Sequence, residues 1–175
     1  SCDITLRWRG PELDVVLNRA HASLQVSVLR LLEALDGWDA VPEVTYSFYG
    51  ERGAIDILAW HAATGSLLVI ELKTYLTDPA ELTRTMDERM RNATRIAALR
   101  GRHPRNVSSW VVMTETRTNR GRVARYREIL APLAGLDGRS MRRWLRSPAG
   151  AVAALSFWTD PEAVISRRVG RPRPR

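Results

Sequence analysis

Cysteine and histidine are scarce in this chain of 175 residues, and their scarcity narrows its chemistry. Cys2 is the only cysteine, which excludes an internal disulfide and a zinc cluster built on thiolates. The three histidines are too far apart in sequence to form a pair with metal-ligand spacing: His21, His61 and His103. The composition therefore argues against a zinc enzyme.

Long apolar segments are also missing. The apolar runs, such as residues 67–70, are far too short to span a membrane. Arg7 and Arg9 are not followed by the apolar segment of a signal peptide, so we expect a cytoplasmic protein without a membrane partner. The length fits one domain, residues 1–166, and the arginine-, glycine- and proline-rich residues 167–175 are expected to form a disordered basic tail.

Lysine is the third scarce residue, because Lys73 is the single lysine among 27 basic residues and the other 26 are arginines. The net charge of +8 favours a polyanionic partner, and nucleic acid is the commonest one. An ammonium is a compact donor, whereas a guanidinium is planar and practically never loses its proton. Lys73 is therefore either the chance survival of one lysine codon or a residue whose site needs an ammonium.

The pattern of apolar residues predicts an α/β domain with the element order α-β-β-β-α-β-α and a further short helix and strand. Apolar residues at helical spacing predict helices over residues 13–35, 79–100, 119–133 and 139–144. Runs of β-branched, aromatic and other apolar residues predict strands over residues 43–49, 54–60, 67–74, 107–114 and 151–158. Tight turns join the first three strands into a meander, and the long second helix is expected to cross over to a parallel fourth strand.

Three charged residues interrupt the second and third predicted strands. Glu71 and Lys73 are two residues apart in one strand and therefore project from the same face. Asp56 lies in the preceding strand and reaches the same end of the sheet if the two strands pair. Two carboxylates fit a hard cation such as Mg²⁺, which takes one or two protein carboxylates together with water and phosphate oxygens. The alternative is a plain ion pair between Lys73 and one of the carboxylates.

The segment Gly53-Ala-Ile-Asp56, fourteen further residues and then Glu71-Leu-Lys73-Thr74 resembles the signature of the PD-(D/E)XK nuclease superfamily. It is similar in particular to the Holliday-junction resolvases and related restriction-type nucleases. The resemblance implies a restriction endonuclease-like α-β-β-β-α-β core with a mixed sheet flanked by helices. It also implies a DNA endonuclease that uses Mg²⁺ or Mn²⁺, in which Asp56 and Glu71 bind the metal and Lys73 serves the attacking water.

The chain departs from the family on the first helix, where many members place a glutamate. The comparable positions here are His21 and Gln25, and Glu43 at the start of the first strand could substitute for the missing acid. The chain also resembles the nuclease-like domain of some helix-turn-helix regulators. That kinship leaves open a catalytically silent module that binds DNA or a regulatory partner, and resolvase-like relatives are often homodimers.

Arginines supply the candidate contacts to nucleic acid. Arg91 and Arg95 are four residues apart on the long helix and share a face that could clamp phosphates, or simply a solvated one. Arg117, Arg120 and Arg122 cluster at the start of the next helix, where a helix N-terminus favours phosphate. Solubility alone would also explain that cluster.

Overall fold

A computed structural model describes residues 11–159 of the chain, with side chains described from residue 15 onward. The basic tail at residues 167–175 and the end of the expected domain therefore lie outside the described residues. The helices are α1 (Pro11–Glu33), α2 (Pro79–Leu99), α3 (Arg117–Arg125), α4 (Arg127–Leu130), the short 3₁₀ helix η1 (Ala131–Leu133) and α5 (Gly138–Arg146). The strands are β1 (Trp38–Phe48), β2 (Glu51–His61), β3 (Ser66–Lys73), β4 (Asn106–Thr114) and β5 (Ala153–Trp158).

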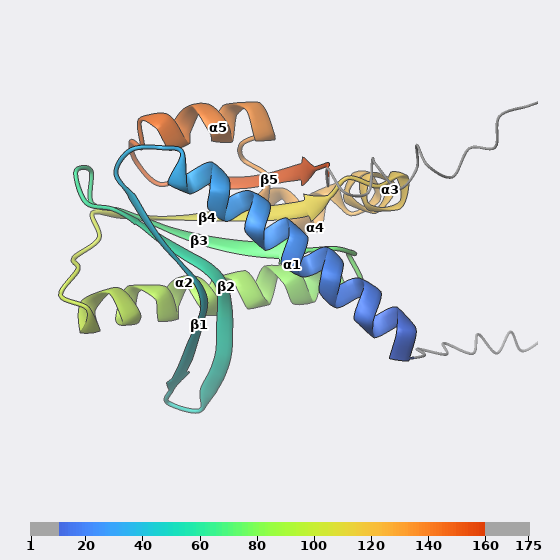
Figure 1. The fold of residues 1–175 in the computed structure, drawn as a ribbon, viewed down its shortest axis with the longest axis horizontal. Helices are drawn as coiled ribbons and strands as arrows, with labels where there is room; N and C mark the ends of the chain where they lie inside the picture. The colour runs from blue at the N-terminus through green and yellow to red at the C-terminus, as the bar shows by residue number, and fades with distance from the viewer. Residues whose placement is uncertain (1–10, 160–175) are drawn as a thin grey trace, which may run out of the picture.

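The five strands form one mixed sheet in the order β1-β2-β3-β4-β5 (Figure 1). The first three strands pair antiparallel through tight turns, and β3, β4 and β5 run parallel to one another. The prediction of an α/β fold with a mixed sheet is confirmed, and so is the parallel pairing of β4 after the crossover helix α2.

Helices cover both faces of the sheet and create two cores. One face packs against α1 and α5 through buried apolar residues such as Val28, Leu32 and Met141. The other packs against α2, α4 and η1, where Met86 and Leu130 are among the buried residues. Because β3 is covered on both sides, its run from Ser66 to Leu72 is buried throughout, as expected for a central strand.

The chain between β4 and β5 differs from the single helix predicted over residues 119–133. The helix α3 ends at Arg125 and α4 begins at Arg127, with Tyr126 as the cap residue between them, and Pro132 lies in the 3₁₀ turn that follows. Leu130 in α4 and Leu133 in η1 are both buried in the core beneath α2.

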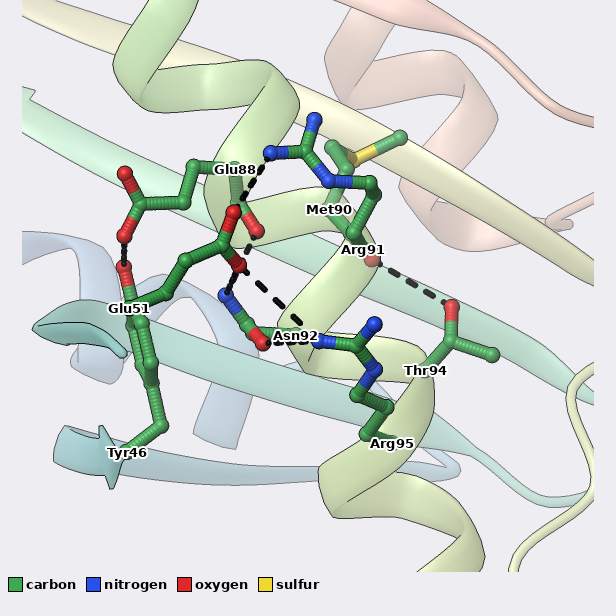
Figure 2. A network of polar contacts seen from close by, with 8 residues as sticks. All are labelled: Tyr46, Glu51, Glu88, Met90, Arg91, Asn92, Thr94 and Arg95. Carbon is green, nitrogen blue, oxygen red and sulfur yellow. Dashed lines mark hydrogen bonds and ion pairs between the residues drawn. The ribbon is translucent and has the colours of Figure 1, made fainter. Parts of the chain in front are cut away.

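A polar network fastens α2 to the hairpin formed by β1 and β2 (Figure 2). Tyr46 donates its hydroxyl hydrogen to Glu88 at 2.7 Å, and Asn92 donates to Glu51 at 2.9 Å. The two contacts fix the middle of the helix over the hairpin. Among the helices of residues 11–159, none combines the length and apolar character that a membrane crossing needs.

Candidate active site

The strands β1 and β2 depart from regular alternation at Glu43 and Asp56. Pro42 pairs with Ile57 and Val44 with Ile55, so Glu43 lies opposite Asp56 between these two pairs. Glu43 has a φ of 51°, in the left-handed region that non-glycine residues rarely adopt. Such backbone strain clusters at functional sites.

The irregularity brings Asp56 to Glu71. The antiparallel pairing of β2 and β3 ends at Ile57 and Ile70, and the same register continued by one residue places Asp56 opposite Glu71. At this position the Asp56 side chain replaces a backbone hydrogen bond between β2 and β3, because its Oδ2 accepts a hydrogen bond from the backbone N–H of Leu72 at 2.7 Å. Both carboxylates are buried, with Glu71 only 1% exposed.

An arginine from α2 reaches both carboxylates. Nη1 of Arg89 lies 3.9 Å from Oδ2 of Asp56 and is in ion-pair contact with Oε2 of Glu71. The Arg89 side chain is 15% exposed, so this pairing is shielded from water. Neither Arg89 Nη1 nor Glu71 Oε2 makes a regular hydrogen bond in the described part of the chain. The two carboxylates thus converge on one cationic atom.

Lys73 completes the cluster from the end of β3. Its Nζ lies 2.8 Å from Oε1 of Glu71, and its side chain is 35% exposed, in contrast to the buried carboxylate. Lys73 also lines a polar pocket of about 150 Å³ at the start of α2, together with residues such as Thr77 and Glu81. The ammonium therefore connects the buried carboxylates with a space open to solvent.

Two of the three candidate accessory residues meet beside Asp56. Gln25 on α1 donates through Nε2 to Glu43 Oε1 at 2.7 Å and lies 3.3 Å from the backbone oxygen of Asp56. Gln25 and Glu43 therefore brace the irregular strand position from the opposite face of the sheet. His21 is half-buried one turn earlier on α1, and no hydrogen bond or ion pair joins it to the described site residues.

The donor set fits a hard dication better than zinc. Among the side chains that the structure describes, from residue 15 to residue 159, no group of three or more histidine, cysteine or acidic residues is placed to hold a metal. Asp56 and Glu71 offer two carboxylates that already converge on a cation, and Glu71 Oε2 is a buried acceptor without a regular hydrogen bond. Mg²⁺ needs only one or two carboxylates, because water and phosphate supply its remaining ligands. A metal held by both residues would require Arg89 to withdraw.

Arg91 and Arg95 belong to the network that fastens α2 to the hairpin (Figure 2). Arg91 donates to Glu51 at 3.0 Å, and Arg95 donates to Asn92 at 3.1 Å and lies over the ring of Tyr49. Hydrogen bonds from Asn92 and then from Arg91 lower the pKa of the Glu51 carboxyl below its ordinary value. Both arginines thus have protein partners, while 55% of the Arg91 side chain and 43% of the Arg95 side chain stay exposed.

The cluster on α3 lies beside the loop that follows Lys73. Arg122 donates to the backbone oxygens of Leu76 and Thr77, and Arg120 is paired with Glu115. Arg117 is exposed at the first position of the helix. The structure therefore brings this cluster near Lys73, but engages two of its three arginines in contacts with the protein.

Asn119 is a supporting residue that the sequence analysis did not single out. It is fully buried and donates to the backbone oxygens of Thr74 and Thr114, while its Oδ1 accepts from the backbone N–H of Leu76. These three bonds tie the loop after β3 to the end of β4. Only its position at the third residue of α3, after the N-cap Thr116, could have drawn attention to it.

Comparison of the chain with protein families, with curated proteins and with solved structures gave no match in any of the three.

Proposed function

We propose that the chain is a metal-dependent endonuclease that hydrolyses DNA phosphodiester bonds at Asp56, Glu71 and Lys73. The observation that carries the proposal is the convergence of Asp56 and Glu71 on one cationic atom, with the ammonium of Lys73 at 2.8 Å from Glu71. Burying a carboxylate costs on the order of several kcal/mol for each ion, unless a cation compensates its charge. A purely structural ion pair needs only one carboxylate.

Each residue has a distinct part in the proposed reaction. Asp56 and Glu71 would hold Mg²⁺ or Mn²⁺, which when bound polarises the scissile phosphate and promotes ionisation of a water. Lys73 faces the pocket at the start of α2, where its ammonium can orient the attacking water and stabilise charge on the phosphate. Gln25 and Glu43 hold the strand position of Asp56 and are positioning residues.

Arg89 favours a second candidate function, a catalytically silent module that binds DNA or a regulatory partner. Its guanidinium neutralises the same two carboxylates that a metal would need. In such a module Arg89 and Lys73 are permanent counter-ions of Asp56 and Glu71, and the arginines on α2 and α3 make the contacts to DNA. The two candidates differ in whether Arg89 leaves when a divalent cation is added.

A cleavage assay separates the two candidates. Plasmid and branched DNA are incubated with the parent chain in Mg²⁺, in Mn²⁺ and in a chelator. We expect cleavage only with a divalent cation, and we expect Lys73→Met to abolish it while DNA affinity and fold are retained. Methionine fills a similar volume, so its packing cost should be below about 1.5 kcal/mol.

Lys73→Arg is the more informative variant, because it preserves the charge in a chain that uses arginine at every other basic position. A salt bridge accepts this change, whereas a site that needs a compact ammonium does not, since the planar guanidinium cannot take the same position. Cleavage by Lys73→Arg at the parent rate would remove Lys73 from the chemistry. Absence of cleavage by the parent with every metal, with DNA still bound, would favour the silent module.

A further inference from the structure

A second and larger pocket lies at the carboxyl end of β5. It has a volume of about 580 Å³, and its walls combine arginines with aromatic rings: Arg120, Arg139, Arg142, Asp137, Phe157 and Trp158. We call it the β5 pocket. Its volume is in the range of small-molecule binding sites, which usually measure about 300–1,000 Å³.

The β5 pocket sits at an open edge of the sheet. The strand β5 is the last in the sheet, and Leu136 pairs with its outer edge only at Ala153 and Leu155. Because β3, β4 and β5 are parallel, their carboxyl ends share one side of the molecule (Figure 1). This is the side on which open α/β sheets bind their ligands.

The charge of the pocket is available to a ligand at Arg139 and Arg142. Asp137 is the one carboxylate of the wall, and it caps α5 by accepting the N–H of Ser140 at 2.7 Å. That hydrogen bond lowers the pKa of the Asp137 carboxyl below its ordinary value. Among the side chains that the structure describes, residues 15–159, no carboxylate forms an ion pair with Arg139 or Arg142, and Asp137 acts on Arg139 only through its charge at longer range. The two guanidinium groups therefore keep donors for a ligand.

Arg120 contributes a flat surface instead of free charge. Two bonds to Glu115 neutralise and fix its guanidinium, which lies 4.5 Å from the centre of the Phe157 ring. Arg142 is likewise held 4.8 Å from the centre of the Trp158 ring. Planar guanidinium groups that are immobilised in this way stack with nucleobases. The wall thus offers donors for an anion and a surface for a planar ring within one cavity.

We propose that the β5 pocket binds one phosphorylated nucleotide, with Arg139 and Arg142 on the phosphate and the base on the Arg120 guanidinium. A duplex keeps its bases stacked in pairs, so the ligand is either a free nucleotide or the terminal nucleotide of a strand. The residues of the pocket do not belong to the carboxylate site, so this inference does not depend on the nuclease proposal.

The test is calorimetric titration of the chain with deoxyadenosine monophosphate, with deoxyadenosine and with inorganic phosphate. We expect the nucleotide to bind at least about ten-fold more tightly than either part, since charged hydrogen bonds to the phosphate and stacking of the base both contribute to its affinity. Arg139→Ala and Arg142→Ala should each weaken nucleotide binding about ten-fold. Arg120→Lys keeps the charge beside Glu115 but loses the flat surface. This variant should weaken binding of the nucleotide more than it weakens binding of inorganic phosphate.

Arg143→Ala is the matched control, because Arg143 is exposed on the same helix and lies outside the pocket wall. Thermal unfolding of each variant establishes that the fold is retained. Absence of saturable nucleotide binding, equal affinity for deoxyadenosine, or an equal loss in Arg143→Ala would overturn the inference. An oligonucleotide with a 5′-phosphate that competes with the nucleotide identifies a strand end as the ligand, and one that does not compete identifies a free nucleotide. Asp56→Asn should leave nucleotide binding unchanged, so a failure of the nuclease proposal is recognised separately.

Discussion

Replacing Arg89 by methionine tests the electrostatics of the carboxylate cluster directly. Methionine keeps an unbranched apolar stem but has no charge and does not extend as far as the guanidinium, so the variant leaves Asp56 and Glu71 with fewer compensating groups. Removing one partner of a buried pair costs about 3–5 kcal/mol. In the variant, Asp56 still accepts the hydrogen bond from Leu72, and Glu71 is still paired with Lys73. We therefore expect a destabilisation at the lower end of this range, about 3 kcal/mol.

The loss should be visible in unfolding experiments carried out in a chelator. For a chain of this length, 1 kcal/mol shifts the Tm by about 2–4 °C, so Arg89→Met should melt about 6–12 °C below the parent. Arg84→Met is the control, since Arg84 is exposed on the same helix and should change stability by less than about 0.5 kcal/mol.

Divalent cations should rescue the variant if Asp56 and Glu71 form a metal site. A ligand at a hundred times its dissociation constant stabilises the fold by about 2.7 kcal/mol, which is close to the expected loss. The parent should gain less from Mg²⁺ or Mn²⁺, because the metal must first displace Arg89. Parent-like stability of Arg89→Met in chelator would refute the buried-pair reasoning. An equal gain from metal in both proteins would show that Arg89 does not compete with the metal, and the absence of any gain in Arg89→Met would refute the metal site.

Two further predictions concern the surroundings of the site. Burial, followed by the hydrogen bond to Glu88, raises the pKa of Tyr46 to about 12, so an alkaline absorbance titration should show a phenol that ionises near pH 12. Because the folded-state pKa exceeds the unfolded value, this contribution to stability is complete below about pH 10 and disappears as the pH rises through about 12. Glu88→Gln should move the step to lower pH, and an unchanged step would contradict the assigned cause. Asn119→Ala should destabilise the fold by about 2–4 kcal/mol, since it leaves one buried and two partly buried backbone groups without this partner. Denaturant unfolding measures the loss, and a loss below about 1 kcal/mol would show that water replaces the amide.

The strand pattern alone predicts the common face of Glu71 and Lys73, because side chains two residues apart in a strand project together. Their ion pair shows that they do. Alternation could not predict the position of Asp56 in the same way, since both β1 and β2 break their alternation at the level of Glu43 and Asp56. Glu43 combines a positive φ with a hydrogen bond from Gln25 on α1, a contact between residues 18 positions apart that no local pattern in the sequence predicts.

The glycine of the Gly53-Ala-Ile-Asp56 motif has an equally non-local cause. Gly53 lies opposite Tyr46, and a Cβ at position 53 would stand 2.5 Å from the Tyr46 hydroxyl oxygen. The glycine therefore allows the tyrosine to lie across the strand and reach Glu88 on α2. The motif identifies the position, but the reason for glycine appears only when the partner strand and the helix are in place.

The burial of Arg89 could have been predicted from the sequence. The buried stripe of α2 is formed by apolar residues at helical spacing, and Arg89 falls within it, three residues after Met86 and four before Ala93. A charged residue in an apolar stripe must find a buried partner, although the identity of that partner depends on the sheet beneath.

With Arg89 present, the two carboxylates and the two cations of the cluster balance to zero charge. In the proposed nuclease, a dication added to this balanced cluster is repelled unless Arg89 leaves or an anionic phosphate arrives with it. Metal affinity should therefore be low in the free protein and rise when DNA is bound, which makes Arg89 the residue that couples the two.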